Sequence, residues 1–158
     1  MLHLVLVEPE IHWNTGNLGR TALAVGATLH LVEPLGFSLD DKHVKRAGLD
    51  YWPRVALRTW PSWSALAAAL PSLGEPWFFS SQATRPYWDA PFADDCVLVF
   101  GRESVGLPRA ILDGAGERAL MIPMRDPALR SLNLSTAAAL AAYEWARQQR
   151  SRSATPSR

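Results

Sequence analysis

Short apolar runs of strand length recur along the chain and constrain its fold more than any other feature. The first reads Leu-His-Leu-Val-Leu-Val. Runs of this kind lie at residues 2–7, 28–32, 77–80, 97–100 and 119–122. A nearly continuous apolar run is typical of a strand that is covered on both faces in a parallel sheet. We predict strands at these five positions, and a sixth at residues 54–59.

Segments with helical spacing or helix-capping residues separate these runs. The predicted helices are Leu18–Val25, Asp40–Ala47, a segment from Ser62 or Ser64 to Leu70, Pro108–Leu112 and a closing helix that ends at about Gln148. Alternating strands and helices predict an α/β fold with a parallel sheet between two layers of helices.

The chain has 158 residues, of which 48% are hydrophobic and 20% are charged, as in one ordinary globular domain. We expect a domain over residues 1–149 and a disordered tail over 150–158. Apolar runs are too short to span a membrane and Cys96 is the single cysteine, so a cytoplasmic protein without membrane contact is expected. A net charge of +1 gives no global attraction to nucleic acid, so any RNA-binding surface must be local.

Polar, glycine-rich loops follow several predicted strands. They cover residues 8–17, 101–108 and 123–133, and the strand at 77–80 ends in serine. Ligands of open α/β sheets bind outside the carboxyl ends of the strands, so these loops form the expected site.

The common nucleotide-binding, hydrolase and metalloprotease motifs are missing from these loops. Gly16 and Gly19 do not complete a G-x-G-x-x-G fingerprint, and the four histidines are scattered. We therefore expect neither a dinucleotide site nor a metal.

Three motifs in order give the chain a family resemblance. They are Asn-Thr-Gly-Asn-Leu-Gly-Arg at 14–20, Phe-Gly-Arg-Glu-Ser-Val-Gly-Leu-Pro at 100–108, and Ile-Pro-Met at 122–124 with Arg-Ser-Leu-Asn-Leu-Ser at 130–135. The chain resembles the SPOUT RNA 2′-O-ribose methyltransferases. Segments 8–11, 35–37 and 45–51 are similar to the small branch that methylates the wobble nucleotide of tRNA.

The resemblance implies a C-terminal trefoil knot, a homodimer with the active site at its interface, and S-adenosylmethionine as cofactor, with S-adenosylhomocysteine as product. It places cofactor contacts at Ser80, Gly101, Glu103, Gly106, Leu107, Ile122, Met124, Ser131, Leu132 and Asn133. Glu103 is expected to hold the loops together rather than touch the substrate. From the residues alone, Gly101 and Gly106 either admit a flat adenine close to the backbone or only make tight turns.

Methyl transfer to a ribose 2′-hydroxyl needs alignment of the two groups and loss of the hydroxyl proton. By resemblance the candidate catalytic residues are Arg20, Ser131, Asn133 and Tyr143. An arginine is too basic to accept a proton, so we assign Arg20 to orienting the ribose and a phosphate, together with Asn14 and Asn17. Tyr143 is either a site residue or a core tyrosine.

The expected RNA partner is the tRNA anticodon stem-loop, with nucleotide 34 (cytidine or modified uridine) as target. Lys42, Lys45 and Arg46 are the predicted phosphate contacts, joined by Arg147, Arg150 and Arg152. His12 and Trp13 depart from the family pattern, which has proline or a small residue at position 13, and an exposed Trp13 would be able to stack on an unpaired base. The alternatives are 2′-O-methylation of ribosomal RNA or another tRNA position, and a non-catalytic RNA-binding knot protein.

Overall fold

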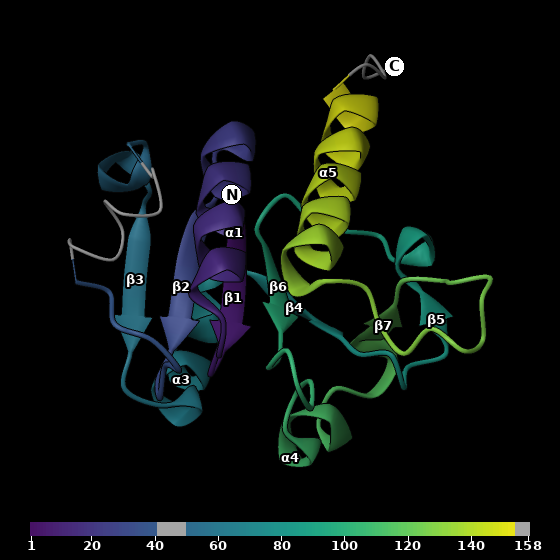
Figure 1. Ribbon diagram of the computed structural model, residues 1–158. Helices are drawn as coiled ribbons and strands as arrows, with labels where there is room; N and C mark the ends of the chain where they lie inside the picture. The colour runs from purple at the N-terminus through teal and green to yellow at the C-terminus, as the bar shows by residue number, and fades with distance from the viewer. Residues whose placement is uncertain (41–49, 154–158) are drawn as a thin grey trace.

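The computed structural model describes residues 1–40 and 50–153 (Figure 1). The strands are β1 (Leu2–Val7), β2 (Thr28–Val32), β3 (Leu57–Trp60), β4 (Glu75–Phe79), β5 (Arg85–Pro86), β6 (Cys96–Phe100) and β7 (Ala119–Met121). The helices are α1 (His12–Val25), α3 (Trp63–Leu73), α4 (Arg109–Asp113) and α5 (Leu134–Ser153), with 3-10 turns η1 (Trp52–Arg54), η2 (Tyr87–Asp89) and η3 (Gly116–Arg118).

The strands form one parallel sheet with the order β3-β2-β1-β6-β4-β7-β5. β1 lies inside the sheet, and each of its residues is nine-tenths or more buried. This confirms the predicted α/β fold and the interpretation of the first apolar run as a strand covered on both faces. All the carboxyl ends point to one edge, which is the lower edge in Figure 1.

Helices cover both faces of the sheet, and the alternation of side chains along β1 divides the core between them. Leu4 and Leu6 pack with Leu18 of α1 and Ala138 of α5. The two valines of β1 pack on the opposite face with α3 and α4. α1 and α5 lie side by side on their face of the sheet, and both begin near the carboxyl ends of the strands (Figure 1).

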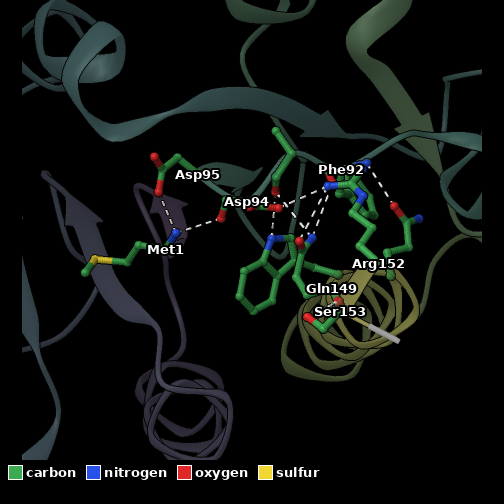
Figure 2. Close-up of polar contacts among 10 residues, drawn as sticks. Met1, Phe92, Asp94, Asp95, Gln149, Arg152 and Ser153 are labelled. Atoms are coloured by element: carbon green, nitrogen blue, oxygen red, sulfur yellow. Dashed lines mark hydrogen bonds and ion pairs between the residues drawn. The ribbon is translucent and has the colours of Figure 1, made fainter. Parts of the chain in front are cut away.

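Loop 90–95 fixes both the N-terminus and the far half of α5 (Figure 2). Trp145 donates its indole N–H to a carbonyl of the loop at 2.9 Å, and Gln148 exchanges two hydrogen bonds of 3.0 Å with the loop backbone. The amine of Met1 donates to a carbonyl and to a carboxylate of the same loop, each at 2.6 Å. Arg152 forms an ion pair with Asp94 of the same loop at 3.2 Å. These contacts set the axis of α5, and hence the position of its first turn at the site.

Several predicted boundaries were wrong. α1 begins at His12, not at Leu18, so most of the expected loop 8–17 is helical. Its asparagines and glycines favour a loop, but distant residues override that preference, as described below. α5 continues to Ser153, beyond the predicted end at Gln148, where Gln149 and Arg152 still contact loop 90–95.

Other differences are smaller. β3 covers Leu57–Trp60 where residues 54–59 were expected, because residues 52–54 form η1. The two-residue strand β5 was not predicted. The helix expected over Asp40–Ala47 lies, apart from its first residue, outside the described residues. The knot and the domain over 1–149 stay predictions. The expected disordered tail does not begin at residue 150, because residues 150–153 belong to α5.

Candidate functional site

The expected site loops follow four neighbouring strands, at the side of the sheet where the carboxyl ends of the strands lie. β1, β6, β4 and β7 are adjacent in that order, and they are followed by segments 8–11, 101–108, 80–84 and 122–133. Motifs that are far apart in the sequence are therefore brought together at the carboxyl ends of the strands, where ligands of open α/β sheets bind.

Glu103 ties the second motif to the start of α1. Its carboxylate accepts hydrogen bonds from the backbone N–H of Glu10 at 2.8 Å, the N–H of Ile11 at 3.1 Å and the side-chain amide of Asn14 at 3.0 Å. The N-cap residue, Ile11, has no side chain able to cap the helix. A carboxylate from a loop 92 residues away supplies a negative charge there instead, where it is favoured by the helix dipole.

Asn14 also bonds to the third motif. The amide of Asn133 donates to Oδ1 of Asn14 at 2.9 Å, and Asn14 is only 4% exposed. Oδ1 of Asn133 in turn accepts from the N–H and hydroxyl of Ser135, at 2.9 and 2.7 Å, and from the N–H of Thr136 at 3.3 Å. Asn133 thus caps α5 and joins its first turn to that of α1. An amide oxygen with three donors is not available to receive the hydroxyl proton of a substrate.

Further contacts between the first and second loops were not predicted. Glu8 forms an ion pair with Arg102, and Glu10 accepts hydrogen bonds from the backbone N–H and hydroxyl of Ser104, at 3.0 and 2.9 Å. Glu8 has a φ of 52°, which is uncommon for a residue with a side chain and recurs at functional sites. The opposite charges of Glu8 and Arg102, each within two residues of a strand end, were the sequence signal for the ion pair.

Arg20 lies on the exposed side of α1, over the ring of Tyr51. The guanidinium carbon is 4.6 Å from the ring centroid, and the Tyr51 hydroxyl donates to the carbonyl of Gly16 at 2.7 Å. A Cβ on Gly19 would lie 2.6 Å from the ring of Trp52. Gly19 thus allows segment 51–55 to pack against α1, which explains why the helix tolerates a glycine there. Tyr51 belongs to segment 45–51, which contributes to the family resemblance, but the sequence did not predict its contact with Arg20.

Ser80, Gly101 and Ile122 stand at the ends of β4, β6 and β7, as expected for one binding edge. A Cβ on Gly101 would lie 2.1 Å from the carbonyl carbon of Gly106, so the turn from Arg102 to Gly106 itself requires glycine. Gly106 has a φ of 73°, which also favours glycine. Of the two explanations left open for these glycines, the tight turn therefore has direct geometric support.

The other expected cofactor residues differ in burial. Leu107 is 5% exposed and belongs to the core beside α3 and α4, so its side chain is structural. Ile122, Met124 and Leu132 are half-buried, and Ser131 is exposed. These last four residues present apolar side chains and a hydroxyl near the strand ends.

Tyr143 lies apart from the asparagine pair. It is 56% exposed and lines a shallow groove on α5 with Thr136, Leu140 and Glu144, beside Tyr87 of η2. Burial and the charge of Glu144 raise the pKa of Tyr87 above its usual range. Within one chain, Tyr143 is therefore not a partner of Asn133, and it is not a core residue either.

The predicted basic surface is only partly described. Lys42, Lys45 and Arg46 lie outside the described residues. Arg147 bonds to Glu144 at 2.7 and 2.8 Å, which lowers the pKa of that carboxyl, and Arg152 pairs with Asp94. Arg150 is exposed on the last turns of α5.

Over residues 1–40 and 50–153, no group of three His, Cys, Asp or Glu side chains is placed to hold a metal ion. Within the same ranges, no helix is both long and apolar enough to cross a membrane. Burial raises the pKa of the Cys96 thiol to about 12, which makes it unreactive.

Comparisons with known proteins agree with this arrangement of motifs. The profile of the SpoU rRNA Methylase family matches residues 1–143. The chain belongs to the SpoU methylase family. This membership confirms the SPOUT resemblance that the three motifs indicated.

Similar members of the SpoU family carry a specific name. The tRNA (cytidine(34)-2'-O)-methyltransferase of Acidovorax sp. (strain JS42) is 45% identical over 150 residues, covering 94% of this chain and 92% of the relative. That of Burkholderia pseudomallei (strain 1106a) is 43% identical, with coverage of 94% and 96%. A solved structure described as giving insights into the 2-OH methylation of C/U34 on tRNA is 49% identical, with a TM-score of 0.88 and coverage of 96% and 98%.

A more distant structure shares the fold. The SpoU methyltransferase AviRb of Streptomyces viridochromogenes, solved in complex with the cofactor AdoMet, is 23% identical, with a TM-score of 0.82. The matched region covers 96% of this chain and 61% of AviRb.

Proposed function

We propose that this chain transfers the methyl group of S-adenosylmethionine to the ribose 2′-hydroxyl of nucleotide 34 of tRNA, a cytidine or a modified uridine. The observation that carries the proposal is full-length similarity, at 43–49% identity, to proteins named or described for this reaction. The direct hydrogen bonds that join Asn14, Glu103 and Asn133 support it, because they assemble the three motifs into one site.

The residues at the strand ends suit the cofactor. Ile122, Met124 and Leu132 offer half-buried apolar surface for an adenine, and Ser131 offers a hydroxyl for its polar groups. When bound, S-adenosylmethionine supplies an electrophilic methyl group on a positively charged sulfur. The side chains of this set bind and orient the cofactor, and Glu103 holds loop 101–108 against the start of α1.

Arg20 is the substrate-orienting residue in this proposal. Its guanidinium is exposed and is held over Tyr51, so its N–H groups are able to bind a phosphate and the ribose while the cation stays charged. The 2′-oxygen gains the methyl group and loses its proton to a group other than Arg20. Glu103 is a poor candidate for that base, because its two oxygens already accept three hydrogen bonds.

A homodimer belongs to the same proposal. Leu140 and Tyr143 are 40% and 56% exposed and line one groove on α5. A second copy that covers this groove would bury both, and it would carry Tyr143 toward the site of the partner. Sedimentation at several concentrations tests this, with Leu140→Glu expected to yield monomers.

The deciding experiment is methylation mapping. The protein is incubated with labelled S-adenosylmethionine and unmodified tRNA, and ribose methylation is located by nuclease digestion and mass spectrometry. We expect label at nucleotide 34; label elsewhere in tRNA, or only in ribosomal RNA, would refute the target. RNA binding without any transfer would favour the non-catalytic alternative.

Arg20→Ala tests the assigned role with a matched control. We expect it to abolish turnover and to leave cofactor affinity near the wild-type value, whereas equal loss of both would remove Arg20 from the substrate side. Arg118→Ala is the control. Arg118 pairs with Glu75 at the start of β4, so it lies at the amino ends of the strands, away from the candidate site.

A further inference from the structure

The exposed face of α1 carries a regular stripe of three different side chains. Trp13, Asn17 and Arg20 are spaced i, i+4 and i+7, and all three are exposed, while Asn14, Leu18 and the other residues between them turn inward. Trp13 is 57% exposed although it is the largest apolar side chain of the helix. Positions 13 and 20 are about 10 Å apart along the helix axis.

Trp13 belongs to a small aromatic platform that consists of His12, Trp13 and Phe37. The rings of His12 and Trp13 have centroids 4.4 Å apart and planes inclined by 38°, and Phe37 lies 6.4 Å from His12. The adjacent Ile11 is 43% exposed. The platform therefore extends an apolar surface directly from the loops of the candidate site.

The chemistry of this surface favours an RNA base over a protein partner. An indole offers a flat π face on which any nucleobase can stack. Arg20 offers a cation to a phosphate, and Asn17 offers an amide to a sugar or a base edge. The nearby carboxylates of Glu10 and Glu103 are engaged by backbone N–H groups, so they repel a phosphate less than free carboxylates would.

We propose that Trp13 is a base-stacking residue of the RNA site, on which an unpaired anticodon-loop base next to nucleotide 34 stacks while Arg20 holds the target nucleotide. This inference rests on the proposed function and adds to it a binding residue at position 13, where the resemblance leads us to expect proline or a small residue. Trp13 acts in binding and takes no part in methyl transfer.

Binding of a fluorescein-labelled tRNA anticodon stem-loop, followed by anisotropy, tests the inference. We expect Trp13→Ala to weaken binding about 5- to 100-fold, the loss associated with one base–aromatic stack, and Trp13→Phe to lose far less. Trp88→Ala is the matched control, because Trp88 is 53% exposed but lies in η2, after the edge strand β5. It should bind as the wild type does.

Abasic substitutions in the loop identify the stacked base. One abasic position should weaken wild-type binding by a similar factor and should have no further effect on Trp13→Ala, because the two changes remove the same contact. Additive losses at every position, or equal binding by Trp13→Ala and the wild type, would overturn the inference. A change in sedimentation of Trp13→Ala would also overturn it, by placing Trp13 in a protein interface.

The wild-type methylation map separates this inference from the proposed function. If binding depends on Trp13 but nucleotide 34 is not methylated, the proposed function is refuted and the stacking role of Trp13 stands. If nucleotide 34 is methylated but binding does not depend on Trp13, the stacking role is refuted and the proposed function stands. A wild-type protein that does not bind the stem-loop would refute both.

Discussion

The guanidinium of Arg20 lies 4.6 Å above the ring centroid of Tyr51, and the hydroxyl of the same tyrosine holds the carbonyl of Gly16, one turn earlier in α1. One side chain from segment 51–55 thus contacts both the motif-one helix and the cation that it presents. An exposed arginine samples many rotamers, so a ring beneath the guanidinium restricts it to the site side of the helix.

Tyr51→Leu should reduce kcat by about two- to fivefold, the value of an exposed cation–π contact, with little change in cofactor affinity. Tyr51→Phe keeps the ring and should retain most of kcat. Steady-state kinetics with tRNA, in the wild-type and Arg20→Ala backgrounds, check the assignment. The Leu substitution should add nothing once Arg20 is absent; an undiminished effect in that background would make Tyr51 merely structural.

The sequence predicted the parallel sheet because the apolar runs of β1, β2 and β6 are long and uninterrupted, and burial on both faces requires such runs. It mispredicted the start of α1 because local propensity at Asn14, Gly16 and Asn17 opposes a helix. The stabilising contacts come from Glu103 and Trp52, which the sequence does not place nearby.

The same distinction applies to the candidate site. Motif spacing brought Asn14, Glu103 and Asn133 to neighbouring strand ends, and the structure joins them by hydrogen bonds. Tyr143 was assigned to that group by resemblance alone, and in one chain it lines a groove further along α5. Contacts between chains leave no periodic pattern in a single sequence.

Glu103→Gln should lower the free energy of unfolding by about 2 kcal/mol, because its hydrogen bonds to Glu10, Ile11 and Asn14 lose the carboxylate charge. For a chain of this length that corresponds to a decrease in Tm of about 5 °C. Thermal unfolding followed by circular dichroism measures it. Glu117→Gln, at an exposed position in η3, should change stability by less than about 0.5 kcal/mol. Equal stability of the two variants would show that Glu103 does not hold α1.

Gly101→Ala should lower both stability and affinity for S-adenosylhomocysteine. The added Cβ would lie 2.1 Å from backbone atoms of Gly106 and Leu107, so the turn must open. Overpacking of this kind costs about 1–3 kcal/mol. Gly114→Ala is the control, because its Cβ would meet its first neighbour at 3.7 Å. Calorimetry of both variants decides; a stable Gly101→Ala protein with wild-type affinity contradicts the requirement for glycine.

A chain of two buried histidines links β1 to β2 and β3 on the face opposite the site helices. Trp60 donates its indole N–H to Nδ1 of His30 at 2.9 Å, and Nε2 of His30 lies 2.9 Å from Nδ1 of His3. Because an indole only donates, Nδ1 of His30 accepts, so its neutral ring carries the proton on Nε2 and donates to His3. A proton added to either ring at these contacts would set two donors against each other.

Acid should therefore destabilise the fold through this pair. Burial, then the charge of His3 and then that of Arg58, lower the pKa of His30 from 6.5 to about 4. Burial and the charges of the Met1 amine and Arg58 lower the pKa of His3, which Asp95 opposes.

Between pH 6.5 and 4 the unfolded chain binds more protons at these histidines than the folded chain does. Their contribution to the free energy of unfolding is therefore fully present above pH 6.5 and is lost as the pH decreases toward 4. The contribution of His30 is about 3 kcal/mol. Urea unfolding at a series of pH values measures the slope. His30→Gln should be less stable at pH 7 yet flatter across this range, whereas His12→Asn, on the surface of α1, should keep the wild-type slope. An unchanged slope in His30→Gln would assign the acid sensitivity to other groups.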